Sequence, residues 1–185
     1  MEQKTRAAML TVVMGFNGTG KTTLLKQILQ ESGQRALVIT PDCVEWTEYP
    51  ENELNTKKDY LFTGINRHIF NPETTLKRVL LFKKGIILFD DCRAYFQDAT
   101  APEVRQLLIR RRQYGVDIFA VGHGFTQVPP VFFTFANTYI LFKTVDNINR
   151  RKDCISQNFD FIKQSQLYVN EKAKVDPHFY RIINN

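Results

Sequence analysis

The sequence predicts an α/β domain in three layers, with helices on both faces of a mainly parallel central sheet. Short apolar strands alternate with amphipathic helices along the chain, and a glycine-rich loop joins the first strand to the first helix. The 185 residues, 43% of them hydrophobic, suffice for one sizeable core. We therefore expect a single domain over 1–185, with its core at about 8–145. We expect residues 146–185 to form a C-terminal extension that packs on the core or on a neighbouring subunit.

Each predicted element rests on a local pattern. Residues 9–14 form a short apolar, β-branched run typical of a buried strand, and the helix at about 21–32 has an apolar stripe and ends at Gly33. Further strands are expected at 36–40, 86–89, 116–121 and 138–142, and further helices at 74–82 and 102–114. Residues 44–72 lack a clear period and are predicted to be loop with short pieces of structure. Residues 146–185 are expected to hold a helix and an edge strand.

Composition narrows the classes of function. Lysine and arginine exceed aspartate and glutamate by 25 to 19, and the resulting charge of +6 permits an anionic partner such as nucleic acid. No apolar run approaches the ~18 residues that a membrane span needs. The three cysteines are far apart and odd in number, which argues against a disulfide framework and fits a reducing compartment such as the cytoplasm.

The strongest motif is a phosphate loop at residues 15–22, which reads GxxxxGK[ST] between a predicted strand and a predicted helix. Glycines at these positions let backbone N–H groups turn toward a phosphate at the positive end of the helix. Lys21 would reach the β- and γ-phosphates of ATP, and the Thr22 hydroxyl would ligate Mg²⁺. The residues expected to bind the nucleotide are Gly15, Phe16, Asn17, Gly18, Thr19, Gly20, Lys21, Thr22 and Thr23.

Two acidic residues follow the apolar strand at 86–89. Ligands of open α/β sheets bind beyond the carboxyl ends of the strands, so Asp90 and Asp91 are well placed to meet the phosphate loop. Asp90 would hold the hydration shell of Mg²⁺, and Asp91 would act as general base on the attacking water. Acids at both positions favour hydrolysis over transfer to a small acceptor. The alternative is a strand that ends in a turn with two solvated aspartates.

Beyond these motifs, residues 40–46 (TPDCVEW) and 110–123 (RRRQYGVDIFAVGH) give the chain a wider resemblance. Together they resemble the HerA/FtsK-type P-loop ATPases, which include DNA translocases, viral genome-packaging ATPases and zonula occludens toxin-like phage assembly proteins. The resemblance implies a RecA-like fold, a homo-oligomeric ring, double-stranded DNA as partner, and a capsid or portal contact. If the protein is viral, the expected location is the host cytoplasm, with association with the virion as an alternative.

The same resemblance implies roles for further residues. One of Arg110, Arg111 and Arg112 would be an arginine finger that reaches a neighbouring subunit, with Arg105 as a further candidate, although the three could equally be solvated cations at a helix C-terminus. His123 stands where family members often have a glutamine that senses the γ-phosphate, and it could instead be a histidine satisfied at a strand–loop junction. Asp91 stands where the family often has glutamate.

A basic stretch with interleaved aromatic residues suits nucleic-acid binding, although a solvated face over core aromatics explains it as well. Its members are Lys57, Lys58, Tyr60, Phe62, Arg67, Phe70, Lys77, Arg78, Phe82, Lys83 and Lys84. A second basic cluster follows at 150–152. The leading hypothesis is Mg²⁺-dependent ATP hydrolysis that drives DNA translocation, as in viral genome packaging. The alternatives are a nucleotide-binding switch or small-molecule kinase, and a phage-assembly ATPase of the zonula occludens toxin type.

Overall fold

A computed structural model describes residues 8–96 and 102–185, and in this part of the chain the strands form one seven-stranded sheet. The strands are β1 Leu10–Met14, β2 Ala36–Thr40, β3 Ile65–Ile69, β4 Gly85–Phe89, β5 Val116–Gly122, β6 Thr138–Leu141 and β7 Arg181–Asn184. Their order across the sheet is β3-β2-β4-β5-β1-β6-β7. Neighbouring strands run parallel except for β6 and β7, which are antiparallel.

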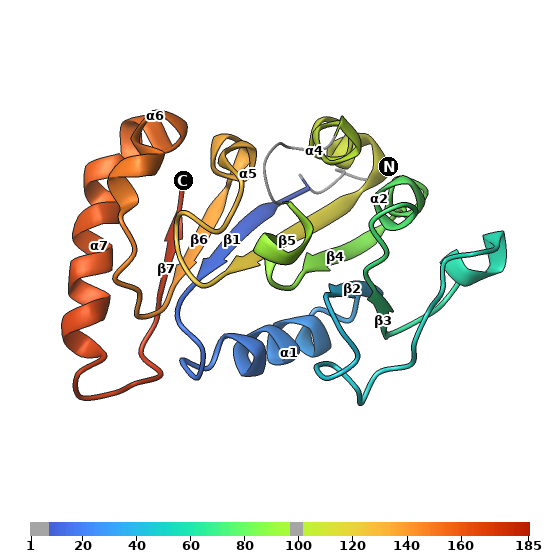
Figure 1. Cartoon of the computed structure of the whole chain (residues 1–185), viewed down its shortest axis with the longest axis horizontal. Coiled ribbons are helices and arrows are strands. Elements are labelled where there is room, and N and C mark those ends of the chain that lie inside the picture. The colour runs from blue at the N-terminus through green and yellow to red at the C-terminus, as the bar shows by residue number, and fades with distance from the viewer. Residues whose placement is uncertain (1–7, 97–101) are drawn as a thin grey trace, which may run out of the picture.

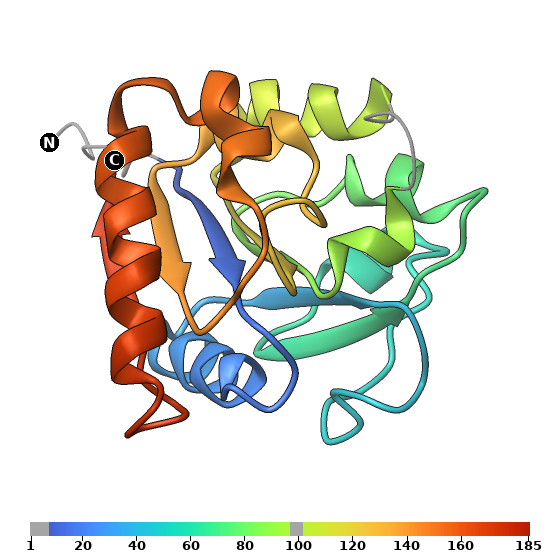
Figure 2. The same ribbon diagram turned by 60° about the vertical axis from the view of Figure 1, so that its left-hand side comes forward.

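Helices cover both faces of this sheet unequally (Figure 1). The helices are α1 Lys21–Glu31, α2 Thr75–Val79, α3 Cys92–Tyr95, α4 Pro102–Tyr114, α5 Pro130–Phe135, α6 Lys152–Ile155 and α7 Phe159–Lys172, with short 3₁₀ turns at Lys57–Tyr60, Ile148–Arg151 and Ser156–Asn158. One face carries α2, α4, α5 and α7, whereas α1 and the segment after β2 cover the other (Figure 2). The predicted three-layer α/β fold with a mainly parallel sheet is therefore confirmed.

The alternation of side chains along each strand produces the two apolar layers. In β1, Val12 and Met14 contribute to the larger cluster under α4 and α5, while Val13 points into the smaller cluster with Leu25 and Leu29 of α1. All five residues of β1 are buried, as expected for a central parallel strand with helices on both faces. Because β1 is buried on both faces, its position in the core is fixed, and the start of the phosphate loop that follows it is fixed as well.

The strand order decides which loops meet. The phosphate loop follows β1, the two aspartates follow β4, and β5 lies between these strands and ends at Gly122, directly before His123. Because all three strands are parallel, their carboxyl ends lie at the same edge of the sheet. This edge therefore brings the loops after β1, β4 and β5 together.

Two sequence-based predictions about the elements need more detail. Residues 44–72 are mostly loop, as expected, and one of their short pieces of structure is a parallel edge strand, β3, which pairs with β2 from Ala36–Ile65 to Thr40–Ile69. Its polar middle residues hide it from an apolar pattern, since an edge strand with a partly exposed face need not be apolar throughout. The helix expected at 74–82 ends early at Val79, because the chain turns there so that Phe82 is fully buried before Lys84 adopts a positive φ of 54°.

The C-terminal region forms the expected helix and edge strand. Helix α7 lies against β6 and β7, and β7 extends the sheet by pairing with β6. The segment between α7 and β7 returns toward the phosphate loop, as Figure 1 shows at the lower left. Within the described residues, no helix is long and apolar enough to cross a membrane.

Candidate functional site

The phosphate loop is anchored to the strands on both sides of β1. The Gly15 N–H donates to the Gly122 carbonyl at 3.2 Å, and the Phe16 N–H donates to the Lys143 carbonyl at 2.9 Å. A Cβ on Gly15 would lie 2.4 Å from the Cβ of Phe142, so only glycine fits there. The loop is thus held where it meets the ends of β5 and β6.

Glycines then turn the loop into α1. Gly18 and Gly20 have φ values of 76° and 92°, a conformation that strains other residues, and Gly20 caps the helix. The first helical hydrogen bond runs from the Leu24 N–H to the Gly20 carbonyl. The amides before Leu24 in the first turn therefore have no partner inside the helix, which is the arrangement that binds phosphate.

Lys21 lies inside the loop, with 8% of its surface exposed. Its ammonium donates to the carbonyls of Gly15 at 2.6 Å and Phe16 at 2.8 Å. Burial lowers the pKa of Lys21, while the carboxylates of Asp90 and its neighbours act in the opposite direction. Phosphate oxygens could replace the two carbonyls as stronger, charge-assisted partners.

Asp90 is a buried carboxyl group held by an indole. It is 8% exposed, and Trp46 Nε1 donates to its Oδ2 at 2.6 Å. Burial raises the pKa of Asp90 to about 6; the carboxyl group of Glu45 also raises it, whereas the Trp46 hydrogen bond and Lys21 lower it. The ionised form of Asp90 is thus costly until a cation approaches.

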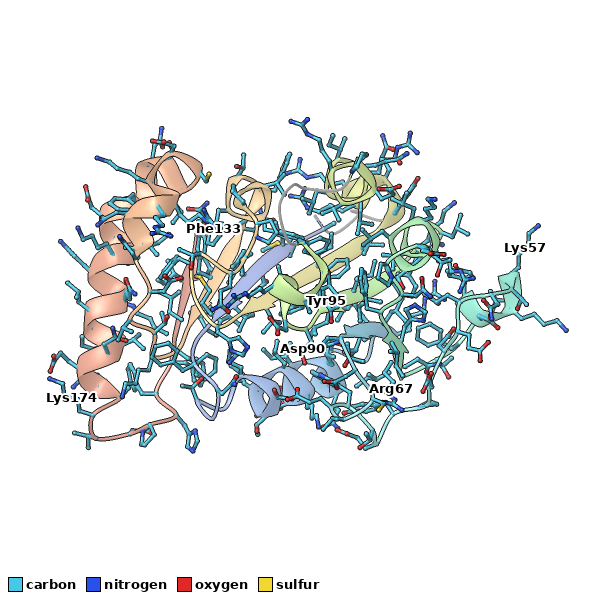
Figure 3. The ribbon with its side chains drawn as sticks, in the orientation of Figure 1. Lys57, Arg67, Asp90, Tyr95, Phe133 and Lys174 are labelled. Atoms are coloured by element: carbon cyan, nitrogen blue, oxygen red, sulfur yellow. The ribbon has the colours of Figure 1, made fainter. Side chains whose placement is uncertain are left out.

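The backbone at Asp90 is fixed by a buried tyrosine. The Tyr95 hydroxyl lies 2.8 Å from the carbonyl of Ile39 and also hydrogen-bonds the carbonyl of Asp90. Burial raises the pKa of Tyr95 far above its ordinary value, so the hydroxyl stays protonated. Figure 3 shows Tyr95 and Asp90 close together near the centre of the molecule. Tyr95 thereby joins the ends of β2 and β4 and keeps Asp90 at the edge of the sheet.

Asp91 adopts a strained backbone that turns its side chain toward His123. Its φ of 56° is in the left-handed region, which costs a residue other than glycine about 1–2 kcal/mol. Its Oδ2 lies 3.8 Å from His123 Nε2. Asp91 Oδ1 and His123 Nδ1 are buried with no hydrogen-bond partner among the described residues. Two buried, unpaired polar atoms at one site indicate a place for a polar ligand or water.

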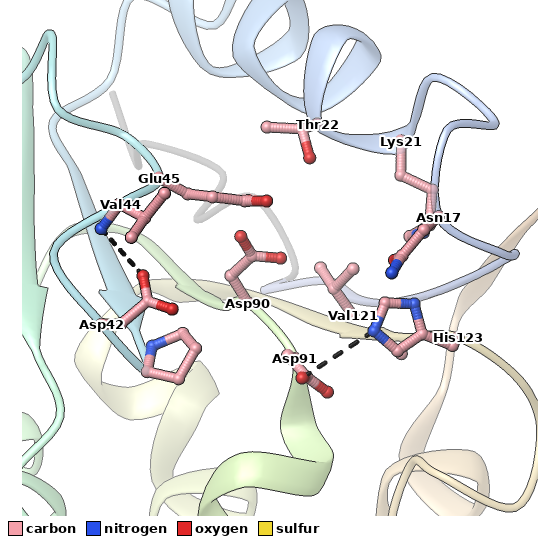
Figure 4. Close-up of a pocket in the computed structure, with 12 residues that line it drawn as sticks. Asn17, Lys21, Thr22, Asp42, Val44, Glu45, Asp90, Asp91, Val121 and His123 are labelled. Atoms are coloured by element: carbon pink, nitrogen blue, oxygen red, sulfur yellow. Dashed lines mark hydrogen bonds and ion pairs between the residues drawn. The ribbon is translucent and has the colours of Figure 1, made fainter.

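These side chains surround one cavity of about 270 Å³ (Figure 4). It is lined by Asn17, Lys21, Thr22, Pro41, Asp42, Val44, Glu45, Asp90, Asp91, Val121, Gly122 and His123. The structure therefore brings the predicted Lys21, Thr22, Asp90, Asp91 and His123 together around a single space. Figure 4 shows the Thr22 hydroxyl and the carboxyl groups of Glu45 and Asp90 pointing into it.

The charge of this cavity fits a divalent cation. Four carboxyl groups (Asp42, Glu45, Asp90 and Asp91) face a single lysine, so an anionic triphosphate alone would be repelled. Carboxylate and hydroxyl oxygens are the ligands that Mg²⁺ takes, and Mg²⁺ commonly uses only one or two protein groups, with phosphates and water for the rest. The described residues contain no cluster of three or more histidine, cysteine or acidic side chains able to hold a metal alone. The Thr22 hydroxyl and the Asp90 carboxylate could supply the one or two protein ligands that Mg²⁺ needs beside phosphates and water.

Three residues of the segment after β2 were missed as site residues. Asp42 and Glu45 line the cavity, and Trp46 holds Asp90. The sequence did contain a signal, because this segment directly follows a predicted strand and must lie at the same carboxyl edge as the phosphate loop. A single tryptophan in that position, itself only 1% exposed, could have been assigned to the site on that ground.

The arginines predicted as finger candidates do not line the cavity. Arg110, Arg111 and Arg112 lie at the end of α4, which leads into the start of β5 at the opposite edge of the sheet, and Arg105 is an exposed residue earlier on the same helix. Arg111 is 5% exposed, donates to the Leu108 carbonyl at 2.7 Å and lies over the ring of Phe135. Because its guanidinium is buried and hydrogen-bonded within its own subunit, Arg111 cannot reach a neighbouring subunit, and its prediction as an arginine finger is corrected. Arg110 and Arg112 are exposed, and a role in a neighbouring subunit stays a prediction for these two.

The basic stretch at 57–84 is a solvated face over core aromatics. Phe82 is fully buried, and Phe62 and Phe70 pack against the same core, so these three rings are not available for base stacking. In the second cluster, Arg151 donates to the carbonyls of Phe125, Thr126 and Val128 and is therefore structural. Exposed lysines such as Lys57, at the far right of Figure 3, remain free to contact phosphates.

Comparison with known proteins supports this architecture. The family model for the CobW/HypB/UreG nucleotide-binding domain matches residues 9–66, which span β1, the phosphate loop, α1 and β2. The chain has the P-loop NTPase fold. The match covers less than half of the chain and does not establish membership of that family. No curated protein sequence matches the chain.

Solved structures share this P-loop NTPase fold over nearly the whole chain. The genome packaging NTPase B204 from Sulfolobus turreted icosahedral virus 2, in complex with AMP, superposes with a TM-score of 0.70 at 13% identity, over 96% of this chain and 92% of that one. B204, the DNA-packaging ATPase from Sulfolobus turreted icosahedral virus, gives 0.67 at 14% identity, over 95% and 97%. At these identities the likeness establishes the fold, and the HerA/FtsK resemblance stays a prediction.

Proposed function

We propose that this protein is a Mg²⁺-dependent ATPase that drives DNA translocation as an oligomeric motor, of the kind that packages viral genomes. The observation that carries the proposal is the single cavity shared by Lys21, Thr22, Asp90, Asp91 and His123. The likeness to the B204 packaging NTPases supports the choice of process. The charge of +6 supports an anionic polymer as partner.

The side chains of the cavity divide the work. Lys21 and the amides of the first turn of α1 bind and orient the phosphates. Thr22 and Asp90 would hold Mg²⁺, which when bound neutralises charge on the β- and γ-phosphates. Asp91 would accept a proton from the attacking water, and His123, 3.8 Å from it, would orient that water or the terminal phosphate.

The absence of an arginine from the cavity's lining bears on assembly. Among the described residues, Lys21 is the one lysine that lines it and no arginine does, so these residues give little cationic support to the charge that develops on the transferred phosphoryl group. A finger supplied by a neighbouring subunit is worth about 10³–10⁵ in rate in other NTPases. Exposed Arg110 or Arg112 would supply it in a ring, where the far edge of one subunit meets the cavity of the next.

The test is Mg²⁺-ATP hydrolysis with and without double-stranded DNA over a series of protein concentrations. The proposal predicts turnover that DNA stimulates and that rises more than proportionally with protein. Arg110→Ala and Arg112→Ala should each be compared with Lys174→Ala, which removes an exposed cation paired with Glu171 at the surface. If the turnover rate per subunit is the same with and without DNA and at every protein concentration, the proposal of an oligomeric DNA motor is contradicted.

A nucleotide-binding switch is the second candidate, and one observation favours it. The CobW/HypB/UreG family model matches the nucleotide-binding segment directly, whereas the viral likeness rests on fold alone. A switch would bind nucleotide with slow, DNA-independent turnover at every protein concentration. The same concentration series therefore separates the two candidates.

A further inference from the structure

A second cavity lies on the other side of the first turn of α1. It has a volume of about 350 Å³, and Gly20, Thr23, Gln27, Phe142, His178 and Tyr180 are among its lining residues. We call it the aromatic cavity, and we call the one around Lys21 the phosphate-side cavity. The two share the turn itself, since Lys21 and Thr22 line one while Gly20 and Thr23 line the other.

The walls of the aromatic cavity are flat and uncharged. The rings of Phe142 and Tyr180 lie 5.2 Å apart between centroids and are tilted by 34°, so they form one continuous face. Phe142 is 1% exposed and packs in the core, while Tyr180 is 39% exposed. In the part of the chain that the structure describes, no aspartate, glutamate, lysine or arginine lines the cavity. A planar neutral heterocycle fits such walls, and a second phosphate group does not.

The segment between α7 and β7 completes this cavity from far along the chain. His178 reaches the phosphate loop, where its Nδ1 would lie 3.2 Å from a Cβ on Gly20. The segment is held by a hydrogen bond from the His178 N–H to Asp176 Oδ1 at 3.0 Å, and by the packing of Phe179 against Tyr168. A ring entering here would therefore meet His178 and Tyr180 in a defined position.

We propose that the aromatic cavity binds the base of the nucleotide whose phosphates occupy the phosphate-side cavity. The inference rests on the proposed nucleotide binding and adds the subsite that holds the base. A nucleotide bound along the first turn of α1 has its phosphates at Lys21 and Thr22 and its base one short step away, at Gly20 and Thr23. Tyr180 would stack on the base, with His178 beside it and the polar groups of Thr23 and Gln27 at the rim.

The test separates the base from the phosphates by comparing ATP with tripolyphosphate, both with Mg²⁺, in calorimetric titrations. Tyr180→Ala should weaken ATP binding about 5- to 150-fold, the usual value of one aromatic stack on a base, and leave tripolyphosphate binding unchanged. His178→Ala should act in the same direction, and Tyr180→Phe should bind ATP like the wild type because it keeps the ring. Phe161→Ala, which removes an exposed aromatic side chain of α7 outside the cavity, is the matched control.

Each other outcome overturns the inference. Unchanged ATP affinity in Tyr180→Ala would remove the stacking, and equal losses for ATP and tripolyphosphate would show that the variant disturbs the phosphate loop instead. If wild type binds tripolyphosphate and ATP with the same affinity, the phosphate side is intact and the base subsite alone is refuted. If wild type binds neither ligand, the proposed function fails together with the subsite.

Discussion

The two cavities beside the first turn of α1 differ in chemistry and in the way that the chain builds them. The phosphate-side cavity pairs Lys21 with four acidic side chains, whereas the aromatic cavity is lined by Phe142, Tyr180 and His178 and, among the described residues, by no aspartate, glutamate, lysine or arginine. The first is formed by loops that directly follow parallel strands. The second needs a segment about 160 residues away in sequence to fold back on Gly20. In the proposed function, the charged side acts on the phosphates and the aromatic side selects the ligand.

Removing the charge at the centre of the phosphate side should have the largest effect. Lys21→Ala deletes two charge-assisted hydrogen bonds, each worth about 1.5–3 kcal/mol, so ATP and tripolyphosphate should both bind about 100-fold or more weakly and turnover should be lost. Titration calorimetry and a hydrolysis assay measure the two effects. Lys57→Ala, which removes an exposed lysine that lines neither cavity, is the control and should bind like wild type. Unchanged affinity in Lys21→Ala would refute the phosphate-side assignment.

The next prediction concerns Asp91 and separates the rate of hydrolysis from the affinity for ATP in the phosphate-side cavity. Asp91→Asn should lower the hydrolysis rate about 10²–10⁴-fold, because an amide cannot accept the proton of the attacking water, while ATP affinity stays close to that of wild type. Single-turnover hydrolysis beside calorimetry gives both values. Glu48→Gln, an exposed acid on the segment after β2, serves as control. If Asp91→Asn turns over at the wild-type rate, Asp91 is not the general base.

The buried carboxyl group of Asp90 predicts a pH-dependent effect on stability. Burial raises its pKa to about 6, so above that pH the folded protein must hold a buried charge that the unfolded chain carries in water. Asp90→Asn should therefore raise the free energy of unfolding by roughly 1–3 kcal/mol at pH 8. The gain should shrink as the pH falls through about 6 and be lost near pH 3, below the pKa of about 3.9 of an aspartate in the unfolded chain, where Asp90 is protonated in the folded and the unfolded protein. Urea unfolding at the two pH values measures this. A gain that is equal at both would contradict the titration of Asp90, and the same variant should lose its response to Mg²⁺.

The sequence predicts the phosphate side well because its signals are local. Residues 15–22 form a contiguous motif whose glycines have a geometric purpose, and Asp90 and Asp91 follow an apolar strand that must end at the same edge. His123 follows by the same rule, since β5 lies between the two strands concerned. Most of the sheet can also be predicted from the sequence, because strands buried on both faces are apolar throughout. The main helices can be predicted in the same way.

The aromatic side and the edge of the sheet could not be found in this way. Contact between Gly20 and His178 depends on the length of α7 and on the pairing of β7 with β6, neither of which has a local pattern. Strand β3 escaped notice because its middle is polar, and His68 in it is buried only through hydrogen bonds to the Asn52 carbonyl and Thr75 Oγ1. The hydrogen-bond partners of His68 are distant in sequence, so the pattern of apolar residues along the chain does not reveal that His68 is buried.

The smallest predicted effect uses the single tryptophan to report which cavity is filled. Trp46 donates its indole N–H to Asp90 and is 1% exposed, while it does not line the aromatic cavity. Its emission should therefore shift slightly when Mg²⁺ and tripolyphosphate bind, shift equally with Mg²⁺-ATP, and stay constant with adenosine alone. Tyr180→Ala should leave the tripolyphosphate response intact, because the reporter and the altered side chain face different cavities. An adenosine response as large as that of tripolyphosphate would mean that the two sides are not independent, and the division of labour across α1 would have to be abandoned.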